Sequence, residues 1–224
     1  MPVTSSGARV ISWVLAASLV AGCAATAQIS LDPQLRQRLG EMGEIRGVHY
    51  YAPAAMRVVS SRNLQWAETD KFLPVEAPVK RVKDRFLAAV SQELGLTKLQ
   101  IIDQPRGARI SVFMAPPIEL LKSEFRHGLV FDFYTGIWEL ARMYQLLPFA
   151  TPRYRFVTIV RARLIRLDDS TILWQQLCLP AGLKPEERTL DEWLANDYAL
   201  LHAEMEREAQ YCADDLMVRF LGKH

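Results

Sequence analysis

Residues 154–179, YRFVTIVRARLIRLDDSTILWQQLCL, contain the pattern that decides the fold. Two runs that are rich in β-branched residues flank Asp168-Asp169-Ser170, and Asp and Ser are residue types that favour turns. This arrangement predicts a long β-hairpin, with strands over 154–167 and 171–179. It is the clearest hairpin signal in the chain.

The segment after the hairpin predicts a long amphipathic helix. Thr189 and Glu192 fit a capping box, in which each side chain satisfies a backbone N–H group of the other residue. Apolar residues then recur on one face at helical spacing. We therefore expect a helix over 189–221, with residues 180–185 as the loop before it.

The segments before the hairpin alternate between short strands and helices. Asp32-Pro33 and Pro78 mark helix starts, and Gly95 marks a helix end. The expected elements are helices over 33–42 and 79–94 and strands over 48–51, 56–59, 99–103 and 109–114. An aromatic-rich insertion at 116–153 interrupts this rhythm, and we expect a short helix over 136–147 within it.

The order of these elements indicates the fold class α/β (α+β). One helix stands between early strands and another follows the hairpin, so helices are expected to pack on one mixed sheet. The chain has 224 residues, of which 50% are hydrophobic and 23% charged, as in ordinary globular proteins. No repeat or second domain boundary is visible, so residues 33–224 are expected to form a single domain.

Two segments resemble known bacterial proteins. The hairpin VRARLIRLDDSTILWQQL and the terminal helix AQYCADDLMVRFL are similar to the small periplasmic lipoproteins of the ABC-type transport auxiliary component. They are also similar to the N-terminal domain of the translocation protein TolB. The resemblance implies an α/β fold and an auxiliary role in envelope transport or assembly. The aromatic-rich insertion lies outside this pattern.

The first 23 residues, MPVTSSGARVISWVLAASLVAGC, have the layout of a secretory signal. One cation, Arg9, precedes an apolar run that is too short to span a bilayer. The run ends in Leu-Val-Ala-Gly-Cys, which resembles the bacterial lipobox. The resemblance implies a lipoprotein signal peptide over 1–22, acylation of Cys23 and a short tether over 23–32. An ordinary cleaved signal with a chance cysteine is the alternative.

The same resemblance implies a location. Ala24 rather than Asp follows Cys23, and by the sorting rule of Gram-negative lipoproteins this favours the outer membrane, facing the periplasm, over the inner membrane. Acyl chains on Cys23 would hold the mature chain to the lipid bilayer. An envelope protein is the expected further partner, and its identity and the oligomeric state stay open.

Charge and motif content favour a non-enzymatic role. The chain has 27 Lys and Arg against 25 Asp and Glu, which leaves no basic field for nucleic acid. Its His and Cys residues show no metal-site spacing, and no nucleotide-binding or hydrolase motif is present, so no metal or cofactor is expected. The alternative is an envelope hydrolase or transferase with a site of dispersed residues. A deep polar cleft that holds His49 or His127 with a carboxylate would favour that alternative.

Cys178 and Cys212 form an even pair once Cys23 is acylated. Cys178 lies near the end of the second hairpin strand and Cys212 on the apolar face of the final helix, so packing of the helix on the sheet can bring them together. An oxidising periplasm favours a disulfide, which requires Cα atoms within about 7 Å. Two buried free thiols are the alternative.

Two sets of side chains carry hypotheses about the surface. Arginines of equal parity on the first hairpin strand point the same way, and form either a solvated face or a contact for anionic envelope material. Aromatic residues of the insertion form either a local core or an exposed docking surface. The first set is Arg153, Arg155, Arg161 and Arg163, and the second is Trp138, Tyr144 and Phe149.

Overall fold

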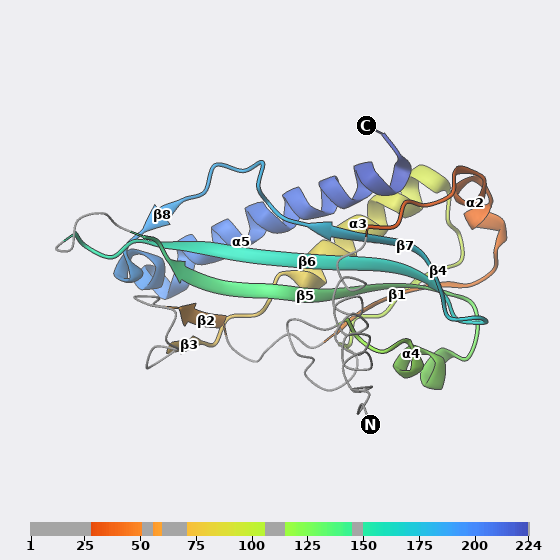
Figure 1. Ribbon diagram of the computed structural model, residues 1–224, viewed down its shortest axis with the longest axis horizontal. Coiled ribbons are helices and arrows are strands. Elements are labelled where there is room, and N and C mark those ends of the chain that lie inside the picture. Colours follow the sequence, from red (N-terminus) through yellow and green to blue (C-terminus); the bar gives the residue numbers. More distant parts are fainter. Residues whose placement is uncertain (1–27, 51–55, 60–70, 106–114, 145–149, 224) are drawn as a thin grey trace, which may run out of the picture.

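The computed structural model describes residues 28–50, 56–59, 71–105, 115–144 and 150–223. The segment expected as a signal peptide, Cys23, Phe149 and the strand expected over 109–114 lie outside these ranges. Within them, one mixed sheet carries two long helices on one face and a short helix on the other (Figure 1). The expected fold class, helices packed on one mixed sheet in a single domain, is confirmed.

The described part of the sheet contains eight strands around the central strand β5. β1 and β2 pair in parallel with one edge of β5, and β6 pairs antiparallel with its other edge. β4 extends the sheet beyond β1, β3 extends it beyond β2, and β7 and β8 extend it beyond β6. The strands are β1 (Ile45–His49), β2 (Met56–Val59), β3 (Lys71–Leu73), β4 (Leu99–Ile101), β5 (Leu129–Arg142), β6 (Tyr154–Arg166), β7 (Thr171–Cys178) and β8 (Glu187–Arg188).

β6 and β7 form the long hairpin that the sequence predicts. Asp169 fixes its turn, because its carboxylate accepts a hydrogen bond from the Thr171 N–H (3.1 Å) and pairs with the Arg166 guanidinium (2.7 Å). Side chains of β6 alternate between the two faces of the sheet. Leu164 enters the main core beneath the long helices, and Ile165 enters a smaller core on the opposite face.

The helix expected over 136–147 is wrong, because this segment begins inside β5. Sheet partners on both edges satisfy the β5 backbone, and Trp138 and Leu140 enter the core at strand spacing. A bulge around Gly136 shifts the register and disturbs the alternation that marks a strand in a sequence. The aromatic-rich insertion at 116–153 therefore contains the central strand of the sheet.

The helices are α2 (Pro33–Arg38), α3 (Val79–Leu94), α4 (Ile118–Phe125) and α5 (Leu190–Leu221), with a 3-10 turn over Leu39–Glu41. α3 and α5 lie side by side on one face of the sheet (Figure 1). Phe86 of α3 is central to this layer, with its ring centroid 5.6 Å from those of Phe131, Trp174 and Phe220. α4 covers the opposite face, where Leu121 is buried in the smaller core.

α5 starts as the sequence predicts and then breaks. The Thr189 hydroxyl accepts a hydrogen bond from the Glu192 N–H (3.2 Å), and the Glu192 carboxylate accepts one from the Thr189 N–H (2.7 Å), so the capping box is confirmed. Residues 195–198 then leave the helical conformation, and three of them have positive φ. Two of the three are Asn and Asp, which tolerate that backbone. The uninterrupted helix expected over 189–221 is wrong at this point.

The segment expected as a tether, 23–32, is partly docked on the domain. Ile29 exchanges two backbone hydrogen bonds with Gln175 of β7, each 2.9 Å long. Leu31 is buried in the main core, and the Asp32 carboxylate caps α2. Any free tether therefore ends before Ile29. Among the described residues, no helix is both long enough and apolar enough to cross a bilayer.

Candidate functional site

Cys178 and Cys212 form a disulfide that joins the end of β7 to α5. Their Cα atoms are 5.5 Å apart, and both residues are fully buried. The predicted bond is confirmed, and it fixes α5 on the sheet next to the point where β7 ends.

Beyond this point the chain leaves the edge of β6 and opens a gap in the sheet. The β6–β7 ladder ends at Val160 and Cys178, and the β6–β8 ladder begins at Arg155 and Glu187. Nine residue steps lead from Cys178 to Glu187, whereas only five lead from Arg155 to Val160 on β6. The loop therefore cannot continue as a strand paired with β6. Two of its residues are prolines, which have no N–H group to donate to a ladder.

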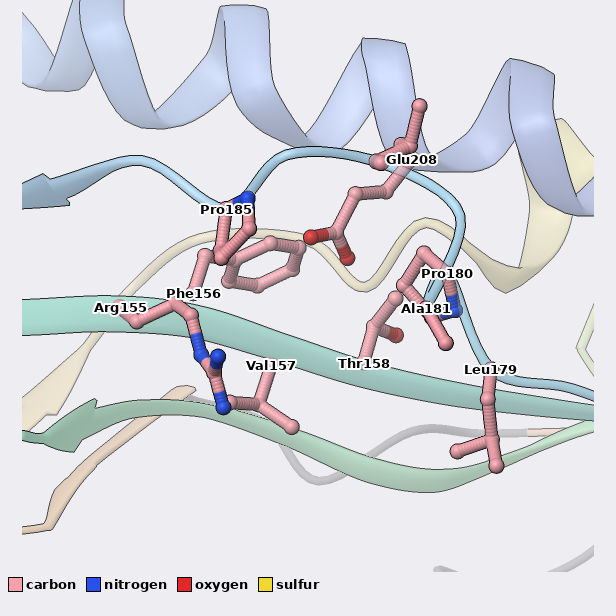
Figure 2. A pocket seen from close by; sticks show the side chains of 10 residues that line it. Arg155, Phe156, Val157, Thr158, Leu179, Pro180, Ala181, Pro185 and Glu208 are labelled. Carbon is pink, nitrogen blue, oxygen red and sulfur yellow. The ribbon is translucent and has the colours of Figure 1, made fainter.

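The gap forms a pocket of about 340 Å³ between β6, the loop and α5 (Figure 2). Its volume is within the range of small-molecule pockets. Most of the wall is apolar, from Phe156, Val157, Leu179, Pro180, Ala181, Leu183 and Pro185, and the polar lining residues are Arg155, Thr158 and Glu208. This lining suits a ligand with a small apolar body.

Glu208 of α5 is the acidic residue of the pocket wall. It is only 5% exposed, its carboxylate points toward the pocket, and its Oε2 atom has no hydrogen-bond partner (Figure 2). Burial raises the pKa of Glu208 to about 8, and the nearby Glu204 adds to the rise, whereas Arg207 and Arg155 oppose it. The carboxyl group is therefore mostly protonated at pH 7.

Sequence reasoning missed Glu208 because it stands in the highly charged stretch EMEREAQ, residues 204–210, which is typical of a helix surface. One signal could have found it. Glu204, Glu208 and Cys212 are spaced by four residues and so share one side of a helix. Since Cys212 belongs to the apolar side, the two glutamates had to be close to the buried side as well, and both are nearly buried.

Arg163 does not belong to a solvated face. Its Nε donates to the Asp132 carboxylate (3.0 Å) and its Nη2 to the Pro116 carbonyl (2.9 Å), and the two charged side chains are almost completely buried. The anionic-contact hypothesis is wrong for this residue, because its charge is already paired inside the fold. Parity along the strand does not reveal that the segment before α4, which contains Pro116, covers this side chain.

The other three arginines have different surroundings. Arg155 lines the pocket, and Arg161 is half-buried. Arg153 is exposed ahead of β6, with its guanidinium 3.6 Å from the Glu192 carboxylate. For these three, contact with anionic material stays a prediction.

The aromatic set is also divided. Trp138 is only 4% exposed and belongs to the main core, so its assignment to a docking surface is wrong. Tyr144, just after β5, is 88% exposed. Phe149 lies outside the described residues. The local-core interpretation therefore holds for the part of the segment that is strand.

His49, His127 and His202 are not among the residues that line this pocket. His49, at the end of β1, is buried with no partner for its Nδ1 atom, and burial followed by the charge of Lys83 lowers its pKa to about 4. Lys83 is itself buried and donates to the Ile102 carbonyl (2.6 Å). His127 is exposed in the turn before β5. The pocket therefore lacks the histidine that would favour a hydrolase or transferase, and the described ranges contain no group of three His, Cys, Asp or Glu residues placed to hold a metal ion.

The chain matches no protein-family model and no curated protein sequence. Its similarity to solved structures is low. A DUF330 protein from Xanthomonas campestris has 11% identity and a TM-score of 0.41, covering 88% of this chain and 94% of that one. A lipoprotein from Neisseria meningitidis has 12% identity and a TM-score of 0.29, covering 75% and 99%. The PelC dodecamer from Paraburkholderia phytofirmans has 12% identity and a TM-score of 0.33, covering 88% and 95%. At such values the likenesses carry no argument, and function has to follow from the chain's own residues.

Proposed function

We propose that the chain is a lipid-anchored lipoprotein of the bacterial envelope with a non-enzymatic binding role in transport or envelope assembly. The buried Cys178–Cys212 disulfide carries the proposal. Disulfides form and persist in oxidising compartments and are rare in the cytosol. The bond therefore supports export, which is the role expected of residues 1–22.

The docked segment at Ile29 supports an anchor close to the domain. Ile29 comes six residues after Cys23, and an extended chain of six residues spans at most about 20 Å. Acylation of Cys23 would therefore hold the β7 edge of the sheet near the bilayer surface. Two or more acyl chains are sufficient for stable attachment.

The pocket beside Glu208 supports binding as the role of the domain. It combines an apolar wall with one buried carboxyl group that lacks a partner. An apolar pocket with a few polar groups is the usual form of a small-ligand site. Ligand capture by an anchored domain fits an auxiliary function in transport.

Palmitate labelling of cells that produce the full precursor tests the anchor. In the Cys23→Ser variant we expect loss of the label and accumulation of the precursor with its signal peptide. Ser30→Ala, close by in the chain, serves as the control and should keep both labelling and processing. Undiminished labelling of the Cys23→Ser protein would overturn the lipoprotein proposal.

A further inference from the structure

The loop over the pocket leaves the Glu208 carboxyl group without a donor. Pro180 and Pro185 have no N–H group, and two other amides of the loop bond within it: Ala181 N–H donates to the Leu179 carbonyl (2.7 Å) and Leu183 N–H to the Pro180 carbonyl (3.1 Å). The nearby Thr158 hydroxyl donates to the Ile137 carbonyl instead (3.3 Å). Among the described residues, Glu208 Oε2 therefore has no donor.

An unfilled buried acceptor is unusual in a folded protein. Leaving such a group unpaired costs about 1–3 kcal/mol, and more if it is charged. In Figure 2 the carboxylate of Glu208 lies above β6 between Phe156 and Thr158 and points into the pocket, whereas the Arg155 guanidinium hangs on the other side of the strand. A ligand in the pocket is thus placed to supply the missing donor.

We propose that the pocket binds a primary ammonium group carried on a small apolar body, with the Glu208 carboxylate as its counter-ion. The proposal rests on the binding role proposed above and names its ligand chemistry. The apolar wall takes the body of the ligand, the ammonium donates to Glu208 Oε2, and the Thr158 hydroxyl oxygen remains free to accept a second hydrogen bond.

The charges around Glu208 favour an organic cation over a metal ion. The charged groups close enough to act electrostatically on Glu208 are Glu204 and Arg207 on α5 and Arg155 on β6. Glu204 is engaged by Arg207, whose Nε lies 2.7 Å from a carboxylate oxygen, so Glu208 is the carboxylate left for a guest. A metal ion would need more ligands than this part of the chain offers, since no group of three ligating side chains is found in the described ranges.

Ionisation of Glu208 couples this binding to pH. The pKa of Glu208 is raised to about 8, so a cationic guest has to release the carboxyl proton as it binds. Apparent affinity should then increase about tenfold for each unit by which the pH rises toward 8, and level off above it. Among these neighbours, the hydrogen bond to Glu204 raises the pKa of Arg207 further above its ordinary value, so the charge of Arg207 does not change in this range.

Calorimetric titration of the full chain tests the proposal with n-pentylamine and 1-pentanol, which share an apolar body and differ in charge. At pH 8 we expect at least tenfold tighter binding of pentylamine. Glu208→Gln should abolish this preference and keep binding of pentanol, which shows that the pocket is intact. Glu206→Gln is the matched control, since Glu206 pairs with Arg81 and Arg85 on α3, and it should leave the preference unchanged.

Equal affinity for the two probes, a preference that survives Glu208→Gln, or an affinity that does not change between pH 6 and 8 would each overturn the proposal. Trialanine distinguishes a peptide N-terminus from a free amine as the source of the ammonium group. Its N-acetylated form, which has no ammonium group, is the control. Tighter binding of free trialanine than of pentylamine indicates peptide N-termini, and the reverse indicates free amines. Loss of acyl labelling at Cys23 bears only on the anchor, so the two proposals can fail separately.

Discussion

Asp132 on β5 and Arg163 on β6 form a buried ion pair between neighbouring central strands. Their side chains are 0% and 3% exposed, and the Tyr50 hydroxyl donates to the same carboxylate (3.2 Å). Burial, followed by the charge of Asp132, raises the pKa of Tyr50 above its ordinary range, so this phenol stays a donor. The cluster ties β5 and β6 to Tyr50, the residue that follows β1.

Arg163→Gln should lower the free energy of unfolding by about 3–5 kcal/mol, because it leaves Asp132 buried without its partner. Arg166→Gln, on the same strand, should cost less than about 1 kcal/mol, since the pair of Arg166 with Asp169 is exposed. Urea denaturation of the two variants measures both effects. Similar stabilities for the two would mean that the buried pair contributes no more than a surface one.

Glu208 should make stability depend on pH. Its pKa of about 8 lies above its ordinary value of 4.5, so the folded state binds the proton more tightly than the unfolded state. The resulting stabilisation is complete below pH 4.5. It falls by about 1.4 kcal/mol for each pH unit between 4.5 and 8, and it is absent above pH 8. Unfolding free energies of wild type and Glu208→Gln at pH 5.5, 6.5 and 7.5 should therefore diverge by that slope. Parallel profiles would contradict the buried, protonated state.

At the scale of elements, the disulfide holds α5 against the end of β7. The double variant Cys178→Ala with Cys212→Ala should lower the free energy of unfolding by about 3–4 kcal/mol, the value expected for closing a loop of 34 residues. Thermal or urea unfolding with and without a reductant measures it. Reductant should destabilise wild type and leave the double variant unchanged, and equal sensitivity of the two proteins would exclude this role of the bond.

Elements that depend on neighbours in the sequence could be predicted. The β6–β7 hairpin follows from its turn residues, the start of α5 from Thr189 and Glu192, and the end of α3 from Gly95, whose φ is +61°. In each case the residues that determine the structure lie within a few positions of one another. The disulfide could also be predicted, because the prediction depended only on which faces of two such elements carry Cys178 and Cys212.

Elements that depend on distant pairing could not be predicted. β5 is a strand because β1, β2 and β6 supply its hydrogen-bond partners, and nothing within 136–147 indicates those partners. The pocket arises in the same way. Its prolines predict a loop, but the gap at the edge of β6 exists only because β8 returns to that strand, and Glu208 becomes a site residue only when α5 covers the gap.

At the scale of the whole molecule, the proposed anchor leads to a prediction about sorting. Ala24→Asp should move the protein from the outer-membrane to the inner-membrane fraction. In the lipoproteins that the segment ending in Cys23 resembles, Asp after the acylated cysteine is the signal for retention in the inner membrane. Ala24→Ser is the control and should leave the distribution unchanged. Density-gradient separation of the two membranes measures it. An outer-membrane location for the Ala24→Asp protein would contradict this sorting rule here.

The central place of β5 has a consequence for how the chain reaches this structure. β1 and β2 are synthesised first, yet the strand that both pair with follows roughly eighty residues later. Contacts of such long range slow folding. Until β5 is available, the edges of β1 and β2 present unpaired backbone groups, and such edges promote aggregation. Refolding in vitro should therefore lose yield as the protein concentration rises.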